Sequence, residues 1–153
     1  MKKSSKLSDV LHVLLHMADQ SEPLTSDALA AMMHSNPVVV RRTLGGLRDK
    51  GLVSSSKGRA GGWTLSCDLS RTTLLDVYRA VGKPALFAFG SRNEASGCLI
   101  EKAVHKTLVS SLLKAEALLL ENFKGTTLLT LYADFSAGMR KVRKSRGAAR
   151  GHG

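Results

Sequence analysis

The sequence is short of cysteine and has no long apolar run. Its 153 residues include two cysteines, Cys67 and Cys98, too few for a disulfide framework to hold the fold. No stretch approaches the roughly 18 uninterrupted apolar residues that a transmembrane helix requires. Asp9, His12 and His16 interrupt the apolar segment near the N-terminus, and no small-residue cleavage site follows it. These absences predict a cytoplasmic protein that does not enter a membrane.

The residue patterns of enzymes are also missing. The sequence contains no Ser–His–Asp or Cys–His arrangement, no phosphate-binding loop, and no carboxylate pair with a neighbouring base. His12 and His16 lie one helical turn apart, but no glutamate lies between them and no third ligand is evident. We therefore predict that the protein is not an enzyme and holds no metal or other cofactor.

Positive charge, in contrast, is abundant. The chain has 23 lysines and arginines against 12 acidic residues, for a net charge of +11 and an isoelectric point near 10.1. A charge of this size favours a polyanionic partner, and nucleic acid comes before an acidic membrane. The alternative is a charge that only keeps the surface soluble, and the location of the basic residues decides between the two.

Six of the 23 basic residues lie in the segment around which the rest of the chain is organised, SNPVVVRRTLGGLRDKGLVSSSKGRAGGWTLSC, at residues 35–67. Asn36 is placed to cap a helix over residues 37–50, with Pro37 as its first residue. Gly51 is placed to end that helix in the left-handed conformation. The apolar residues that recur at helical spacing and predict its buried stripe are Val40, Leu44 and Leu47.

A helix-turn-helix and a hairpin complete this region. Apolar residues at helical spacing predict an amphipathic helix over residues 8–20, and Thr25 is placed to cap a short second helix. A short turn then leads into the helix at 37–50, and the second helix of such a pair normally enters the major groove of DNA. Residues 54–65 predict two short strands with a glycine-rich basic tip. A basic helix followed by a basic hairpin is the layout of a winged helix. For the first helix, the predicted buried stripe is Leu7, Leu11, Leu14 and Ala18.

The face of the helix at 37–50 that is left outside the buried stripe predicts contacts with DNA. Arg41 points away from the stripe and is the predicted base reader, because arginine meets guanine O6 and N7 with two hydrogen bonds. Arg42 and Arg48 are predicted to clamp phosphates, which fixes register without reading sequence. Val38 and Val39 are predicted to meet thymine methyl groups.

The hairpin tip and the helix cap complete the predicted DNA-binding set. Lys57 and Arg59 flank Gly58, and glycine allows the backbone to approach the sugar-phosphate chain closely. A cationic side chain at the tip is suited to a narrow minor groove. Asn36 joins the set at the start of the helix. The alternative for all of these residues is that they simply solvate an exposed helix and hairpin.

A second capped helix and a long helix follow the hairpin. Thr73 and Asp76 have the spacing of a capping box, residues 83–97 have no sustained period, and a long helical pattern runs from residue 98 or 99 to about residue 123. Thr127 is placed to cap a last short helix through Phe135. The apolar stripe of the long helix, which is wider than a monomer's outer helix requires, comprises Val104, Leu108, Leu112, Ala115, Leu118, Leu119 and Leu120.

The segment GLVSSSKGRAGGWTLSCDLSRTTLLDVYRAVG resembles the wing and following helix of the Rrf-two family, the winged-helix bacterial regulators that include IscR, NsrR and CymR. The matching residues are Ser56, Lys57, Gly58, Gly61, Gly62, Trp63, Leu65 and the Thr73-capped helix. The resemblance covers about residues 5–135. It implies a homodimeric transcription factor whose long helix packs against its twin and which binds a palindromic operator. It places the base-reading positions on Val38, Val39 and Arg41, and the minor-groove position on Lys57.

The chain departs from the cluster-binding members of that family in its cysteines. Those members place three cysteines in the loop and at the start of the long helix, and Cys98 alone matches here. Because cluster ligation normally takes several thiolates, we predict no iron–sulphur cluster. A single thiol near a helix N-terminus is a candidate sensor of oxidants or electrophiles, and an unreactive half-buried cysteine is the alternative. Cys67 is interpreted as structural.

The predicted organisation follows from these segments. A winged helix-turn-helix occupies residues 1–82, a linker or effector loop 83–97, a helical dimerisation region 98–137 and a disordered basic tail 138–153, which has no apolar period. The fold is predicted to be mainly α with a small β-hairpin wing and a long dimerisation helix. The predicted function is that of a dimeric, sequence-specific DNA-binding repressor that is redox-responsive through Cys98, with an effector that the sequence does not identify.

Two other functions fit the same sequence. One is a nonspecific architectural protein that binds nucleic acid through the winged helix and the basic tail. Its binding is expected to collapse when residues 138–153 are deleted, whereas sequence-specific binding is expected to survive that deletion. The other is a protein–protein module with no DNA affinity near physiological salt.

Overall fold

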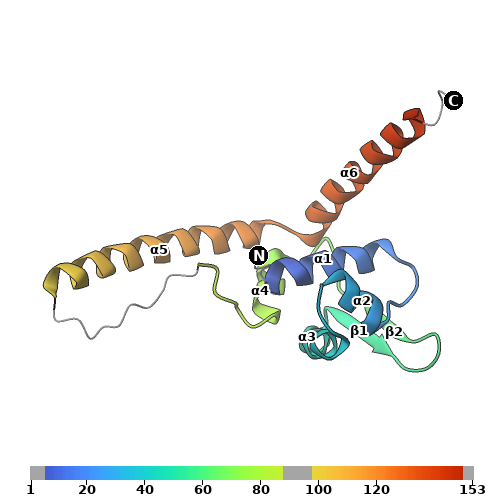
Figure 1. Ribbon diagram of the computed structural model, residues 1–153, viewed down its shortest axis with the longest axis horizontal. Helices are drawn as coiled ribbons and strands as arrows, with labels where there is room; N and C mark the ends of the chain where they lie inside the picture. The colour runs from blue at the N-terminus through green and yellow to red at the C-terminus, as the bar shows by residue number, and fades with distance from the viewer. Residues whose placement is uncertain (1–5, 88–97, 150–153) are drawn as a thin grey trace.

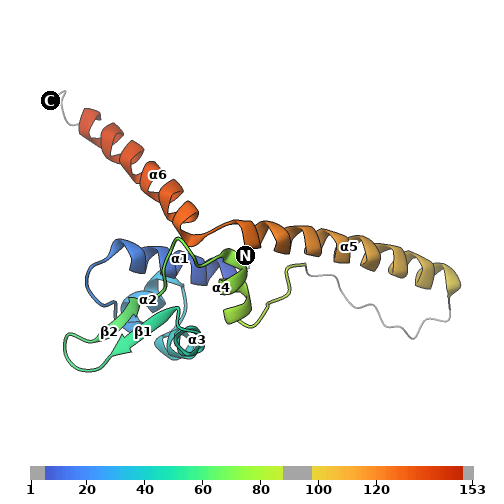
Figure 2. The same cartoon turned by 180° about the vertical axis from the view of Figure 1, so that it is seen from behind.

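The chain is mainly helical, with one short hairpin. The computed structural model describes residues 6–87 and 98–149, with side chains as far as residue 140. Helices α1 to α4 and the hairpin gather into one body, from which α5 and α6 project in different directions (Figure 1). The opposite view shows the same arrangement (Figure 2). The elements are α1 Lys6–Asp19, α2 Ser26–Met32, α3 Pro37–Asp49, β1 Val53–Ser56, β2 Gly62–Leu65, α4 Leu74–Ala80, α5 Leu99–Gly125 and α6 Leu128–Ala149.

One apolar core joins α1 to α4, the hairpin and the start of α6. The predicted stripe of α3 is confirmed, since its members are fully buried. The prediction for α1 was partly wrong, because Leu11 and Ala18 are only partly buried while Val10, Val13 and Met17 are buried in their place. The two faces have the same spacing, and contacts with β2 and α4 select the one that is buried. The largest fully buried side chains are Leu14, Leu29, Leu44, Leu47, Leu128, Val10, Val13, Val40, Val53 and Val77.

The predicted ends of α3 are present. Asn36 Oδ1 accepts hydrogen bonds from the backbone N–H groups of Val38 and Val39, at 3.0 Å each, and Pro37 occupies the first turn. Gly51 has φ = 74°, and Leu52 N donates to the carbonyl of Leu47 at 3.0 Å. This pattern is the Schellman motif, which turns the chain directly from α3 into β1.

The other predicted caps are also present. Thr25 accepts a hydrogen bond from Ala28 N at the start of α2. Thr73 and Asp76 form a reciprocal capping box at the start of α4, in which Thr73 N donates to the Asp76 carboxylate at 2.8 Å. Thr127 accepts from Thr130 N at the start of α6. Each cap satisfies backbone donors that the first turn of a helix leaves unpaired.

The hairpin is attached to the connection between α1 and α2. β1 and β2 pair antiparallel, from Val53 opposite Leu65 to Ser56 opposite Gly62. Leu24 adds a further bridge to β2, since its N–H donates to the Trp63 carbonyl at 2.9 Å and Trp63 N donates back at 2.8 Å. The Trp63 indole N–H also donates to Ser26 Oγ at 3.0 Å. The wing is therefore fixed at its base.

The glycines of the wing serve two different purposes. Gly58 has φ = 100° and forms the tip. A Cβ atom on Gly61 would lie 2.5 Å from the carbonyl oxygen of Ser56, and one on Gly62 would lie 2.6 Å from the carbonyl oxygen of Leu24. Glycine at the tip is predicted to let the backbone approach DNA, whereas Gly61 and Gly62 allow the chain to approach itself.

Among the described residues, the side chains of α5 and α6 that pack on the core lie near the point where the two helices meet. Leu120 and Phe123 of α5 pack against the core, and the Phe123 ring lies edge-on to Tyr78 of α4 with centroids 6.2 Å apart. In α6, Leu128 is buried and the Tyr132 hydroxyl donates to Asp19 Oδ1 of α1 at 3.1 Å. In the part of the chain that the structure describes, no helix is long and apolar enough to span a membrane.

The structure differs from the sequence analysis at the C-terminus. The last helix was predicted to end near Phe135 and the tail from residue 138 to be disordered, but α6 continues to Ala149. The absence of an apolar period indicates only that this segment has no face to bury. The segment is nevertheless helical, because arginine, lysine, methionine and alanine all favour the helical backbone. Residues 150–153, and residues 88–97 of the predicted linker, lie outside the described part of the chain.

The close approach at Gly62 gives a testable prediction about stability. Gly62→Ala is expected to lower the free energy of unfolding by about 1–3 kcal/mol, because the new methyl group must displace the Leu24 backbone. Gly46→Ala is the control, since a Cβ atom there meets nothing within 4 Å, and it is expected to gain up to about 1 kcal/mol in the interior of α3. Denaturant unfolding followed by circular dichroism measures both variants. Unchanged stability of Gly62→Ala would contradict the assignment.

Candidate nucleic-acid interface

The outer face of α3 carries apolar and basic side chains together. Burial of the stripe that contains Leu44 turns the opposite side of the helix to solvent, where Val38 is 67% exposed and Val39 is 45% exposed. Arg41, which lies on the same outer side, is exposed as well. Exposed valines beside an arginine near a helix N-terminus suit the methyl groups and acceptor atoms of a major groove.

The Asn36 cap stabilises the first turn of α3. Because Asn36 Oδ1 is already occupied by two backbone donors, the side-chain amide N–H group is what Asn36 retains for an outside partner. The turn before it is tight, since His34 adopts φ = 47° and Ser35 N donates to the Ala30 carbonyl at 2.9 Å. The turn and cap together fix the angle at which α3 leaves the body.

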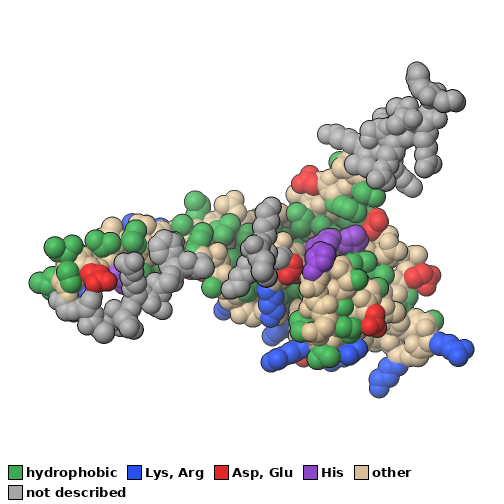
Figure 3. All heavy atoms as spheres, viewed as in Figure 1, with side chains coloured by type: hydrophobic (Ala, Val, Ile, Leu, Met, Phe, Trp, Pro, Cys, Tyr) green, Lys and Arg blue, Asp and Glu red, His purple; other side chains and the backbone are tan. Residues whose placement is uncertain are grey.

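The tip of the hairpin supplies the second basic group. Lys57, Gly58 and Arg59 are all exposed. Lys and Arg side chains occur along the lower edge of the body in Figure 3, from the region under α4, past α3, to the hairpin. Helix α3 and the hairpin, which carry the predicted residues, lie side by side along this edge of the body (Figure 1).

Few acidic groups neutralise this side. Among the described residues, Arg48 has a salt bridge with Asp49, at 3.7 Å between two exposed side chains, and such a pair contributes little. Arg41, Arg42, Lys57 and Arg59 have no salt bridge with any described residue. Their charges are therefore available to an anionic partner.

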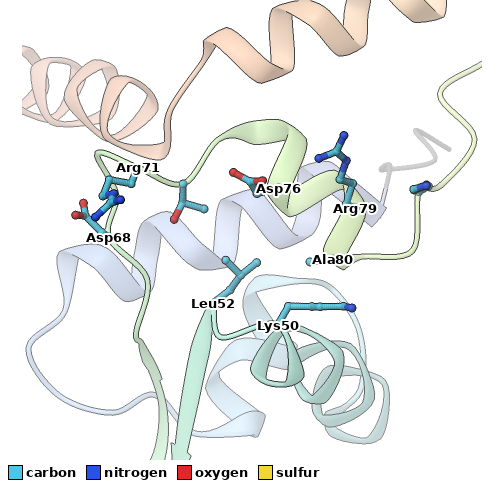
Figure 4. Close-up of a pocket in the computed structure, with 9 residues that line it drawn as sticks. Lys50, Leu52, Asp68, Arg71, Asp76, Arg79 and Ala80 are labelled. Atoms are coloured by element: carbon cyan, nitrogen blue, oxygen red, sulfur yellow. The ribbon is translucent and has the colours of Figure 1, made fainter.

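A pocket that the sequence analysis did not identify lies where α3 ends. It has a volume of about 700 Å³ and is lined by residues from the end of α3, the start of the hairpin, the loop before α4, and α4 itself. Figure 4 shows Lys50 and Arg79 on opposite edges of this pocket, and Asp68 close to Arg71 at one end. The hydrogen bonds from the Ser70 hydroxyl and backbone N–H hold the pKa of Asp68 below its usual range.

The two cysteines differ in their surroundings. Cys98 is exposed and directly precedes α5, with no side-chain hydrogen bond to cap that helix. Cys67 is half-buried against the core, and burial raises the pKa of its thiol above the ordinary value, against a smaller opposing effect of the hydrogen bond with Thr72. A raised pKa disfavours the reactive thiolate.

His12 and His16 of α1 lie close together, but the described residues add no third metal ligand to the pair. The Nε2 atoms of His12 and His16 lie 2.9 Å apart, and the His16 ring lies 6.4 Å from that of Phe135 in α6. Within residues 6–87 and 98–149, no group of three or more His, Cys, Asp or Glu side chains is arranged to hold a metal ion.

A helix-turn-helix with an exposed second helix, followed by a basic hairpin fixed at its base, defines the class of winged-helix DNA-binding proteins. The particular family follows from the sequence. Residues 3–134 match the model of the Rrf2 family, which is described as an iron-dependent transcriptional regulator. This is the Rrf-two family that the wing segment resembles. The chain belongs to this family and is thus a DNA-binding transcriptional regulator rather than an enzyme.

Individual relatives agree with this assignment. The chain is 30% identical over 105 residues to the HTH-type transcriptional regulator YwnA of Bacillus subtilis, covering 69% of this chain and 77% of that protein. It is also 30% identical over 127 residues to the HTH-type transcriptional regulator YffB of Lactococcus lactis, covering 73% of this chain and 81% of the other.

Solved structures share the fold. A transcriptional regulator from Lactobacillus plantarum superposes with a TM-score of 0.67 at 23% identity, covering 93% of this chain and 97% of that one. The oxidized form of Staphylococcus aureus CymR gives a TM-score of 0.60 at 20% identity, covering 86% and 96%. IscR from T. potens gives 0.56 at 20% identity, covering 88% of each chain.

Proposed function

We propose that this Rrf2-family regulator is a homodimeric repressor that binds a palindromic operator through α3 and the wing. The observation that carries the proposal is the exposed outer face of α3, which carries Val38, Val39 and Arg41 and is followed in the chain by a hairpin with exposed cations at its tip. A symmetric dimer that presents two such helices matches two half-sites about one helical turn of DNA apart. Occupation of the operator would block transcription.

The contacts divide into readers and clamps. Arg41 reads a guanine, and Val38 and Val39 meet thymine methyl groups. Arg42 and Arg48 bind phosphates on either side of the groove. These roles follow from side chains that are exposed and, apart from the weak Arg48 pair, unpaired with described residues.

The wing and the helix cap have supporting roles. Lys57 enters the minor groove beside the bases that α3 reads, and Arg59 and the Gly58 backbone follow the sugar-phosphate chain. Asn36 orients the first turn of α3 through its two backbone hydrogen bonds and offers its amide N–H group to a phosphate.

Helix α5 is the dimerisation element. It has no buried residue in the isolated chain, although much of it is apolar. An apolar face of this length is unfavourable in water and favours pairing with a second copy of the helix. The large hydrophobic side chains of α5 that remain exposed are Leu99, Ile100, Val104, Leu108, Leu113 and Leu118.

The cysteines do not fit an iron–sulphur cluster. Cluster iron is typically held by several thiolates, whereas Cys67 is half-buried in the DNA-binding body with a raised pKa and Cys98 is the single cysteine near the start of α5. We propose that the protein regulates without a cluster or other resident cofactor. Exposed Cys98 is instead the candidate redox sensor, and its oxidation acts by changing the relative placement of the two DNA-binding bodies.

Selection of bound sequences from a random DNA pool at about 150 mM salt, where weak phosphate binding is suppressed, tests the proposed function. The wild-type protein is expected to recover a palindrome. Arg41→Ala is expected to lose roughly 1–3 kcal/mol of preference at one base position in each half-site, since it removes a bidentate contact. Recovery of no motif would contradict sequence-specific regulation and favour the architectural alternative.

Two controls accompany the selection. Arg42→Ala is expected to weaken binding to all sequences alike, because a phosphate clamp carries no sequence information. On a promoter that overlaps the selected palindrome, added protein is expected to lower transcription in vitro, and a rise would identify an activator.

The dimer is tested by a charge on the apolar face of α5. Leu108→Asp is expected to give monomers in analytical ultracentrifugation, because the carboxylate cannot be buried against a second helix. Ser110→Asp adds the same charge about 200° around the helix and is expected to leave the dimer intact. A dimer that survives Leu108→Asp would place the interface elsewhere.

The thiol proposal is tested by labelling and reconstitution. Cys98 is expected to react with a maleimide well before Cys67, and peroxide is expected to change operator affinity in the wild type and in Cys67→Ser but not in Cys98→Ser. Anaerobic incubation with iron and sulphide is expected to yield no visible absorbance from a bound cluster. Equal peroxide effects in both serine variants would reject Cys98 as the sensor, and stable cluster absorbance would reject the cluster-free proposal.

A further inference from the structure

The pocket lies at the C-terminal end of α3, the helix whose first half carries the proposed base-reading residues. Lys50 follows the last residue of α3, and Leu52 directly precedes the hairpin, which begins at Val53. Arg79 comes from the last turn of α4 and Lys83 follows that helix. Lys50 and Arg79 lie on opposite edges of the pocket in Figure 4. Basic residues that are far apart in the sequence therefore border a single hollow.

The two carboxylates of the pocket are engaged locally. Asp76 accepts hydrogen bonds from Thr73 N at 2.8 Å and Thr73 Oγ1 at 2.7 Å. Asp68 accepts from Ser70 N at 2.8 Å and Ser70 Oγ at 2.6 Å. Neither carboxylate has a salt bridge with a described lysine or arginine.

Four cations and two carboxylates line the pocket, so its lining carries a net charge of +2, because a carboxylate that accepts hydrogen bonds keeps its charge. Lys50, Arg79 and Lys83 have no salt bridge within residues 6–87 and 98–140, and Lys50, Arg79 and Lys83 are exposed. Side chains of like charge around an open pocket raise its potential and attract an anion. The pocket therefore favours ligands that carry phosphate groups.

We propose that this pocket is a second phosphate site, in which the DNA backbone next to the operator half-site binds to Lys50, Arg79 and Lys83. The inference rests on the proposed function and extends the DNA footprint beyond α3 and the wing. Cations on opposite edges suit a row of successive phosphates, one per about 3.4 Å of helix axis on each strand, better than a single small anion, which needs donors that converge on one point. Lys50 also lies two residues beyond Arg48, the predicted phosphate clamp of α3.

The test compares the salt dependence of DNA binding by the wild type and by Lys50→Gln/Arg79→Gln/Lys83→Gln. The logarithm of the binding constant falls with the logarithm of salt concentration with a slope of about 0.9 per phosphate contact. The triple variant is expected to lower the magnitude of that slope by about 2 to 3 on both operator and random DNA. Its preferred base sequence is expected to stay the same, because phosphate contacts do not read bases.

The control is Lys102→Gln/Lys106→Gln/Lys114→Gln, which removes the same charge from exposed positions on α5. It is expected to keep the wild-type slope, and both variants are expected to keep the wild-type melting temperature. If the salt slope of the control variant falls as much as that of the pocket variant, the loss of net charge explains the change and the proposal is overturned. An unchanged slope in the pocket variant would overturn it as well.

A phosphate-bearing small molecule is the other source of the same chemistry, and inorganic phosphate is the probe for it. One combination of results would assign the pocket to a free ligand and overturn the backbone proposal. In that combination, phosphate raises the melting temperature of the wild type without DNA, the pocket variant loses this effect, and the salt slope of its DNA binding is unchanged. Failure of the proposed function is a separate result, because it appears as a wild type that selects no palindrome. The slope on random DNA still tests the pocket in that case.

Discussion

The burial of one stripe of α3 is the constraint on which the surface of the molecule depends. Val40, Leu44 and Leu47 are completely buried, and a helix that buries one side must present the other to solvent. That side carries Val38, Val39 and the arginines. The same burial places the helix end where Gly51 turns the chain into β1, so the position of the wing follows from the packing of the helix before it.

The parts of the fold that sequence reasoning predicted correctly are those governed by local signals. Asn36 before Pro37, Thr73 before Asp76 and Gly51 after a helical stripe each act within a few residues, and the structure contains all of these features. The parts that it missed are governed by distant partners. Nothing around Leu24 indicates that its backbone pairs with Trp63, and the buried face of α1 is selected by elements that come later in the chain.

The residues of the candidate interface also differ in whether local sequence signals predict them. The residues of α3 and of the hairpin tip were identified because they are close in sequence and their faces follow from periodicity. The pocket was not identified, since Lys50, Arg79 and Lys83 belong to different segments and no spacing relates them; only the packing of α4 beside α3 brings them to one pocket. Helix α6 shows a different limit, because a segment without an apolar stripe can still be helical when its residues favour that backbone.

The length of α5 has a mechanical consequence. The helix has 27 residues and therefore spans about 40 Å, with its contact on the core at the Phe123 end and Cys98 at the other. A rotation of about 5° at the core end displaces the far end by about 3.5 Å. A shift of a few ångströms at the Cys98 end of α5 therefore corresponds to a rotation of only a few degrees of this helix relative to the DNA-binding body.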